Sequence, residues 1–175
     1  MPLNPVLYAP AARADDFQMR TIPMTSGQSG VPEAIRHLVH TVPRAPEDVV
    51  PQGCKPEDID GLEARTGLAI PPEMREWLQY TNGPCIGPGG LFGIRPNRRS
   101  MDIEHYLGLF PAWAERRWLP VAGDGCGNYF VLECDVAQSR RILFVDTHEA
   151  PQHGEAAADN LWAFLGNTLE AEAKD

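Results

Sequence analysis

The spacing of apolar residues changes once along this 175-residue chain, and that change limits the folds open to it. Apolar side chains first recur every three or four positions, as on one face of an α-helix, in residues 33–42, 56–66 and 72–81. Short apolar runs and glycine-rich turns then predict β-strands at residues 91–94, 118–122, 129–134 and 141–146. A short helix is predicted at 101–109, and helical spacing returns after residue 159. Helices, then strands, then a closing helix predict an α+β fold.

Composition restricts the partners and the compartment. The chain has 15 Lys and Arg against 24 Asp and Glu, a net charge of −9, which disfavours nucleic acid and suits a basic protein partner. No apolar stretch approaches the length of a membrane span, and we expect no signal peptide. The four cysteines form no CxxC pair. We therefore expect free thiols and a cytoplasmic protein.

The N-terminal segment differs from the rest of the chain. Residues 1–30 contain four prolines and apolar residues without a period, and they end in a Ser/Gly-rich run. This pattern is typical of a flexible arm and linker. We expect residues 31–175 to form one folded domain.

The helix ends carry recognisable signals. Pro56 suits the first position of a helix, where its missing N–H has no partner to lose. Gly67 predicts a left-handed stop, with Leu68 folding back on Leu62 in a Schellman closure. Asp159 is the expected N-cap of the last helix.

Several short motifs follow one another in a recognisable order. They are Ile59 to Pro71, Trp77-Leu78, Asn82-Gly83, Leu91-Phe92-Gly93 and Leu119 to Gly127. In this order and spacing they resemble the SUKH superfamily, over residues 33–171. The motif positions are Leu62, Glu63, Gly67, Pro71, Trp77, Asn82, Gly83, Pro120, Gly123 and Gly127. Asn128 stands where the family pattern has Asp, so a charge-dependent role of that position is not expected here.

The resemblance implies a fold and a function. The SUKH domain is shared by a fungal cell-wall-synthesis regulator and by many bacterial immunity proteins, and it implies helices packed on one twisted, mostly antiparallel sheet. It also implies binding rather than catalysis, and we expect a non-catalytic protein-binding domain with no cofactor. We expect an intracellular immunity protein that neutralises a basic toxin. The alternative is a regulatory scaffold of the same fold that binds a host protein.

The most unusual segment is the loop from Gly123 to Asn128, which we expect to form a binding surface with the glycine-rich loop 87–90. Asp124 is the first candidate for a partner-binding charge, and Asn128 is the second candidate in this loop. In the alternative role, Asp124 hydrogen-bonds its own turn. Trp113 and Trp118 are candidate anchors, because Trp is enriched at binding hot spots.

A second alternative to the immunity function is an enzyme. Cys126 between two glycines would be a nucleophile if His148 served as its base and Asp146 oriented the imidazole, as in a small cysteine hydrolase. The other Cys and His residues are too scattered to predict a metal site.

Several arginines are expected to form ion pairs with nearby acids. The arginines are Arg95, Arg98, Arg99, Arg116 and Arg117, and the acids are Asp102, Glu104 and Glu115.

Overall fold

The computed structural model describes residues 30–43, 49–135, 140–150 and 152–174. The predicted flexible arm, residues 1–30, lies outside the described residues except for Gly30, so its role stays a prediction.

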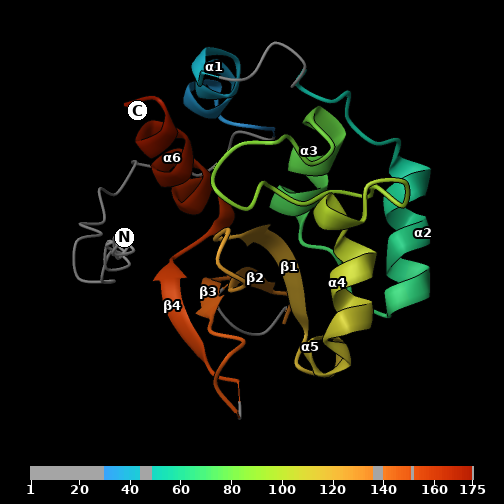
Figure 1. Cartoon of the computed structure of the whole chain (residues 1–175). Helices are drawn as coiled ribbons and strands as arrows, with labels where there is room; N and C mark the ends of the chain where they lie inside the picture. The colour runs from blue at the N-terminus through green and yellow to red at the C-terminus, as the bar shows by residue number, and fades with distance from the viewer. Residues whose placement is uncertain (1–29, 44–48, 136–139, 151, 175) are drawn as a thin grey trace, which may run out of the picture.

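Six α-helices surround one four-stranded sheet in the described part of the chain, which confirms the α+β prediction (Figure 1). The helices are α1 (Glu33–Thr41), α2 (Pro56–Thr66), α3 (Pro72–Tyr80), α4 (Ile103–Leu109), α5 (Pro111–Glu115) and α6 (Leu161–Glu172). The strands are β1 (Trp118–Gly123), β2 (Tyr129–Glu133), β3 (Ile142–Val145) and β4 (Gly154–Ala158). Every neighbouring pair is antiparallel, and the spatial order follows the chain order.

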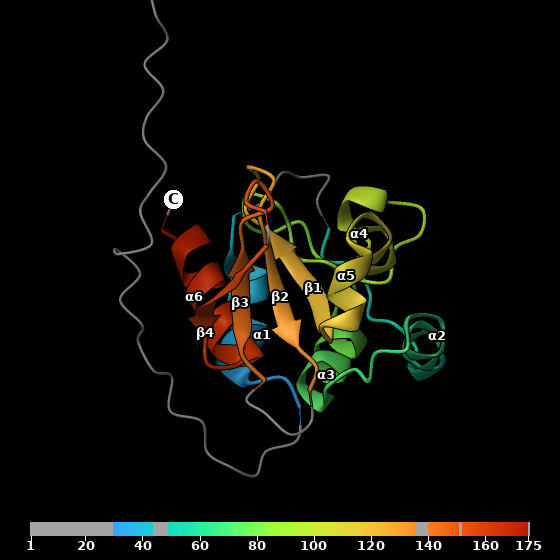
Figure 2. The ribbon, with the colours of Figure 1, turned by 90° about the horizontal axis from the view of Figure 1, so that it is seen from below.

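Helices cover both faces of the sheet. Tyr129 and Phe130 are consecutive in β2, so their side chains leave opposite faces. The Tyr129 ring lies 5.7 Å from that of Trp113 in α5, and the Phe130 ring lies 4.9 Å from that of Phe164 in α6. Figure 2 shows α5 beside β1 and α1 behind the strands. The core therefore forms on both sides of β2.

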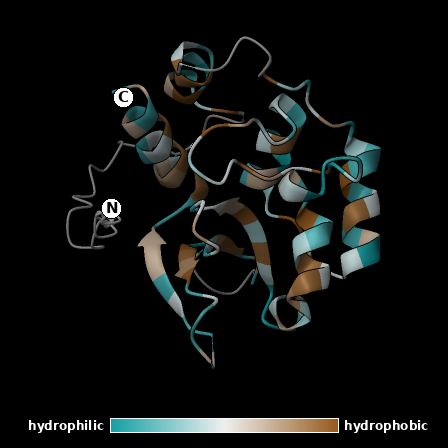
Figure 3. Ribbon diagram, viewed as in Figure 1, coloured by the Kyte–Doolittle hydropathy of each residue, from teal (hydrophilic) through white to brown (hydrophobic). Residues whose placement is uncertain are grey.

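Figure 3 shows the apolar residues concentrated on β2, β3 and the inner sides of the helices, whereas β4 is paler and more hydrophilic. The largest fully buried side chains include two tryptophans, Trp77 and Trp113. No helix in the described ranges is long and apolar enough to cross a membrane.

The predicted strand at 91–94 is wrong. Leu91 forms only an isolated antiparallel bridge to Ala122 in β1, and Gly93 forms a parallel bridge to Asp102. Because residues two positions apart pair with different segments, no continuous ladder develops. The predicted helix at 101–109 is also shorter, because Arg99–Met101 is a 3₁₀ turn before α4.

The stop of α2 is confirmed at Gly67, whose φ is 71°. Its N–H donates to the Glu63 carbonyl at 2.8 Å, which is the single bond of the αL motif. The expected Schellman closure is absent, because the Leu68 N–H donates to Thr66 Oγ1 (3.3 Å) and not to Glu63. Leu62 and Leu68 are nevertheless both buried in the core.

The N-cap of α6 also differs from the expectation. Asn160 precedes the helix in extended conformation, and its side-chain oxygen accepts from the Ala163 N–H at 2.9 Å. Asp159 lies one residue too early to reach that donor and is exposed.

Candidate functional site

Three loops meet at one end of the sheet. They are residues 87–90, the β1–β2 loop at 123–128 and the β3–β4 turn at 146–149, and together we call them the loop surface. A Cβ on Gly125 would lie 3.0 Å from the Pro88 carbonyl oxygen, and a Cβ on Gly127 would lie 3.4 Å from His148 Nε2. The predicted association of the first two loops is therefore present, and the third loop joins them.

Asp124 holds the β1–β2 loop in shape. Its Oδ1 accepts from the N–H groups of Cys126 (2.7 Å) and Asn128 (2.9 Å), and its Oδ2 accepts from Asn128 Nδ2 (2.9 Å). Gly125 and Gly127 have φ values of 78° and 98°, which favour glycine. The structure thus contains the Asx-type turn that was the alternative role of Asp124.

Asn128 links this loop to the β3–β4 turn. Its Nδ2 donates to Asp124, and its Oδ1 accepts from the Thr147 N–H at 3.3 Å. Thr147 Oγ1 donates in return to the Gly127 carbonyl at 2.6 Å. An aspartate at position 128 would have no N–H to offer Asp124. The amide at this position therefore suits a loop that already contains one carboxylate.

The loop surface is acidic. It carries Asp124, Asp146 and Glu149 and contains no Lys or Arg. Asp146 Oδ1 accepts from the backbone N–H of His148 at 2.8 Å, whereas the side chain of Glu149 is exposed. Burial raises the pKa of Tyr129 beside the loop, and the negative charge of Asp124 raises that pKa further.

The Asn82-Gly83 motif anchors the segment that contains loop 87–90. Asn82 Oδ1 accepts from the Ile94 N–H at 2.7 Å, and Asn82 Nδ2 donates to the Ile94 carbonyl at 2.9 Å. Gly83 has a φ of 67°, and a Cβ there would lie 2.8 Å from the Gly93 nitrogen. The motif therefore fixes both ends of the segment that contains loop 87–90.

The other motif residues are structural as well. Glu63 Oε1 accepts from the Ile70 N–H at 2.6 Å, and its Oε2 pairs with Arg75 of α3 at 3.0 Å. Arg117 Nη1 donates to the Gly67 carbonyl at 2.9 Å. These contacts tie α2, α3 and the start of β1 together. Four further motif residues lie in or next to these elements, namely Pro71, Trp77, Pro120 and Gly123.

Trp113 is wrong as a surface anchor. Its side chain is fully buried, stacks on Phe110 with ring centroids 4.3 Å apart, and donates from Nε1 to Gln152 Oε1 at 2.9 Å. Trp118 is half-buried, with the Arg116 guanidinium 4.9 Å from its ring centroid. Trp118 begins β1 and the loop surface lies at the other end of this strand, so the structure does not bring Trp118 and Asp124 together.

No hydrogen bond between the Cys126 thiol and His148, as a cysteine hydrolase would need, occurs among the described residues. His148 Nε2 lies 3.5 Å from the carbonyl oxygen of Cys126, and Asp146 bonds the backbone of His148. Burial raises the pKa of Cys54 to about 11 and that of Cys134 to about 12, which suppresses their thiolates. No group of three potential metal ligands occurs among the described residues.

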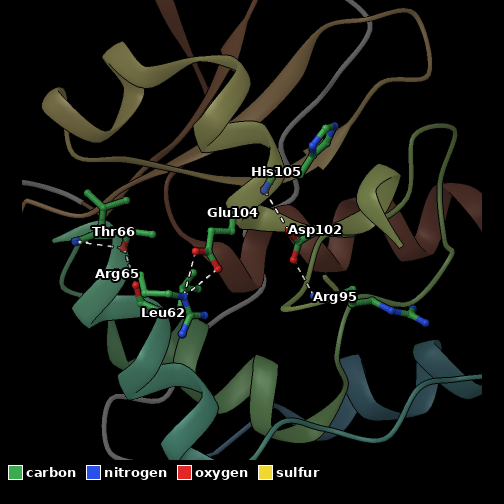
Figure 4. A network of polar contacts seen from close by, with 8 residues as sticks. Leu62, Arg65, Thr66, Arg95, Asp102, Glu104 and His105 are labelled. Carbon is green, nitrogen blue, oxygen red and sulfur yellow. Dashed lines mark hydrogen bonds and ion pairs between the residues drawn. The ribbon is translucent and has the colours of Figure 1, made fainter. Parts of the chain in front are cut away.

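The expected pairing of the arginine run is wrong. Glu104 pairs with Arg65, at 2.9 Å, and both oxygens of Asp102 accept backbone N–H groups (Figure 4). The Arg95 side chain extends away from Asp102 and donates to the Gly83 carbonyl at 2.9 Å. The side chains of Arg116 and Arg117 also donate to backbone carbonyls, those of Gln152 and Gly67. Arg98, Arg99 and Glu115 form no ion pair within the described ranges.

Comparison with known proteins gives one family. The model of the SMI1/KNR4 family (SUKH-1) matches residues 53–167, about two thirds of the chain. A search of curated proteins finds no match. The matched range includes all three loops of the loop surface and every motif residue named above. Sequence reasoning missed Glu149, the exposed acid of the surface, because only the fold brings the β3–β4 turn beside the β1–β2 loop.

Proposed function

Because the chain belongs to the SMI1/KNR4 family (SUKH-1), we propose that it is a non-catalytic protein-binding domain that acts as an immunity protein. In this proposal it binds a basic toxin and blocks the toxin's action. The binding site is the loop surface, at residues 87–90, 123–128 and 146–149.

One observation carries the proposal. Three loops that are far apart in the sequence meet at one end of the sheet, and they contribute Asp124, Asp146 and Glu149 without a single Lys or Arg. The chain as a whole carries a charge of −9. Such a surface attracts a basic partner over a distance of about a Debye length, roughly 8 Å at physiological salt, and so accelerates encounter.

The loops are also held in place before any partner arrives. The Asp124 carboxylate accepts three hydrogen bonds, and Asn128 and Thr147 join the two hairpin loops. A surface that is ordered in the free protein loses less conformational entropy on binding. This order supports a role in recognition rather than a loop that folds on contact.

The contacts around Cys126 also support binding over catalysis. His148 Nε2 lies 3.5 Å from the carbonyl oxygen of Cys126, and no hydrogen bond joins the imidazole to the thiol in the described part of the chain. The acidic side chains of the loops are used in turns or face solvent.

The test is a pull-down with this chain as bait, followed by co-expression with the basic toxin domain that the proposal predicts to be encoded beside this gene. The proposal predicts a stoichiometric complex and restored growth. Full toxicity at equal expression of this chain would contradict it and would favour the regulatory-scaffold alternative.

A pair of variants then locates the surface. Glu149→Gln removes an exposed charge from the loop surface, and Glu57→Gln removes an exposed charge from α2. We expect slower association for Glu149→Gln and wild-type association for Glu57→Gln. Equal effects of the two variants would place the binding site elsewhere.

A further inference from the structure

A hollow lies between residues 49–52, which precede α2, and residues 95–98, which precede the 3₁₀ turn. It shares no lining residue with the loop surface. Its volume is about 350 Å³, in the range of small-ligand sites. The lining residues are Val49, Val50, Pro51, Gln52, Cys85, Arg95 and Arg98. The lining therefore combines apolar side chains with two arginines.

The two arginines of this hollow have no carboxylate partner among the described residues. Arg95 uses one N–H group on the Gly83 carbonyl, at 2.9 Å, which orients its guanidinium and leaves its other donors available. Arg98 is exposed and forms no ion pair within the described ranges. The nearest acid in sequence, Asp102, is occupied by the backbone N–H groups of Arg95 and His105, at 2.7 and 3.0 Å.

One apolar residue of the lining is also uncovered, whereas Val50 packs against the core. Val49 is 79% exposed and is one of two large hydrophobic residues that the described chain leaves in solvent. An exposed apolar side chain beside two guanidinium groups suits a ligand that is apolar at one end and anionic at the other. The hollow therefore differs in sign from the acidic loop surface.

We propose that this hollow binds a carboxylate attached to a small apolar body, as at the C-terminus of a peptide that ends in an aliphatic residue. The guanidinium fork matches the two oxygens of a carboxylate, and charge-assisted bonds of this kind are the stronger class. Val49, Val50 and Pro51 would cover the aliphatic side chain, and the Gln52 amide is available to the peptide backbone. This inference does not rest on the proposed immunity function.

The test is a titration of the full chain with acetyl-valyl-leucine, followed by ¹H–¹⁵N NMR and calorimetry. The matched probe is the same dipeptide with a C-terminal carboxamide. We expect the acid to bind and to shift the Val50 amide signal, and the carboxamide to bind at least tenfold more weakly, because it lacks the charge. Equal affinity of the two probes would overturn the proposal.

Two arginine variants provide the control. Arg98→Gln removes a lining guanidinium, and Arg99→Gln removes the adjacent exposed arginine that does not line the hollow. We expect about tenfold weaker binding for Arg98→Gln and unchanged binding for Arg99→Gln. An equal loss in both variants would mean that only the local positive charge matters, and would overturn the site.

Cysteine alkylation provides an independent readout. Cys85 lines the hollow, whereas Cys126 is exposed on the loop surface. Bound acetyl-valyl-leucine should slow the alkylation of Cys85 and leave that of Cys126 unchanged. Equal rates with and without the probe at Cys85 would place the ligand elsewhere.

Two further probes identify the source of the carboxylate. Isovalerate that binds as well as the dipeptide would indicate a free small acid, and tighter binding of the dipeptide would indicate a chain end; both support the proposal. Inorganic phosphate that competes as strongly as the dipeptide would overturn it, because the apolar residues of the lining would then contribute nothing. Absence of binding by every probe would also overturn it, as expected if an acid of the chain itself occupies the guanidinium groups.

Discussion

Replacing Asn82 with alanine should destabilise the protein more than any other exchange of one polar side chain in this segment. Asn82 accepts from the Ile94 N–H at 2.7 Å and donates to the Ile94 carbonyl at 2.9 Å. Both bonds are partly buried, and Asn82 itself is half-buried. The substitution removes the hydrogen-bond partners of both backbone groups of Ile94 at once.

The size of the loss follows from the two unsatisfied groups. A buried backbone group without its partner costs about 1–3 kcal/mol, and partial solvation at this site reduces that value. We therefore expect a decrease in the free energy of unfolding of about 2–4 kcal/mol for Asn82→Ala. For a chain of this length, about 3 kcal/mol corresponds to a melting temperature roughly 6–12 °C lower.

Urea denaturation followed by tryptophan fluorescence measures this difference. The matched control is Asn97→Ala, because Asn97 is exposed in the turn 95–98 and its side chain forms no hydrogen bond in the described structure. The control should lose less than about 0.5 kcal/mol. A loss below about 1 kcal/mol for Asn82→Ala would refute the reasoning, because water would then satisfy Ile94 as well as Asn82 does.

Three further predictions follow from single residues. Gly67→Val should lower the free energy of unfolding by about 1–3 kcal/mol. The loss comes from backbone strain alone, since a Cβ at Gly67 meets no atom within 4 Å. An unchanged melting temperature would contradict the left-handed stop. In alkylation at pH 8 with mass-spectrometric readout, exposed Cys126 should react before Cys54 and Cys134, because the pKa values of these two are raised to about 11 and 12 and leave about one thiolate in 10³ and 10⁴. Their labelling should rise with pH, and rapid labelling of Cys134 in the native protein would refute its burial. Asp124→Asn should lower stability by about 1–2 kcal/mol in urea, because an amide on this side chain would face the Asn128 amide; a stability equal to wild type would mean that the turn does not depend on the carboxylate.

The elements that sequence predicts best have their signals inside the element. The bounds of α2 are confirmed at both ends, because Pro56 fixes its first turn and Gly67 its last. Strand β4 was not predicted, since its sequence of Gly, Glu and Ala has no β-branched or aromatic residue. It pairs with β3 along an edge that only tertiary structure supplies. Helix α5 was missed because its five residues are too few to show a period.

At the candidate site, too, sequence predicts the features that have a local signal and misses those that depend on tertiary packing. The glycines of the β1–β2 loop mark it as a turn, and the two hypotheses for Asp124 were both available from its position. Which N–H groups its carboxylate accepts depends on the conformation of the folded loop, and the contacts of this loop with Thr147 come from a distant segment. Trp113 illustrates the difficulty for an aromatic residue in an aperiodic segment, where exposure and burial give the same sequence pattern.

The most direct test of the acidic loop surface as a binding site is the salt dependence of association with the toxin domain. Stopped-flow measurements from about 0.02 to 0.5 M salt shorten the screening length from roughly 20 Å to 4 Å. We predict that the on-rate of the wild type falls at least tenfold while the off-rate changes by less than about threefold. Glu149→Gln should reduce the on-rate at low salt and flatten its slope. An on-rate that is independent of salt would contradict the account.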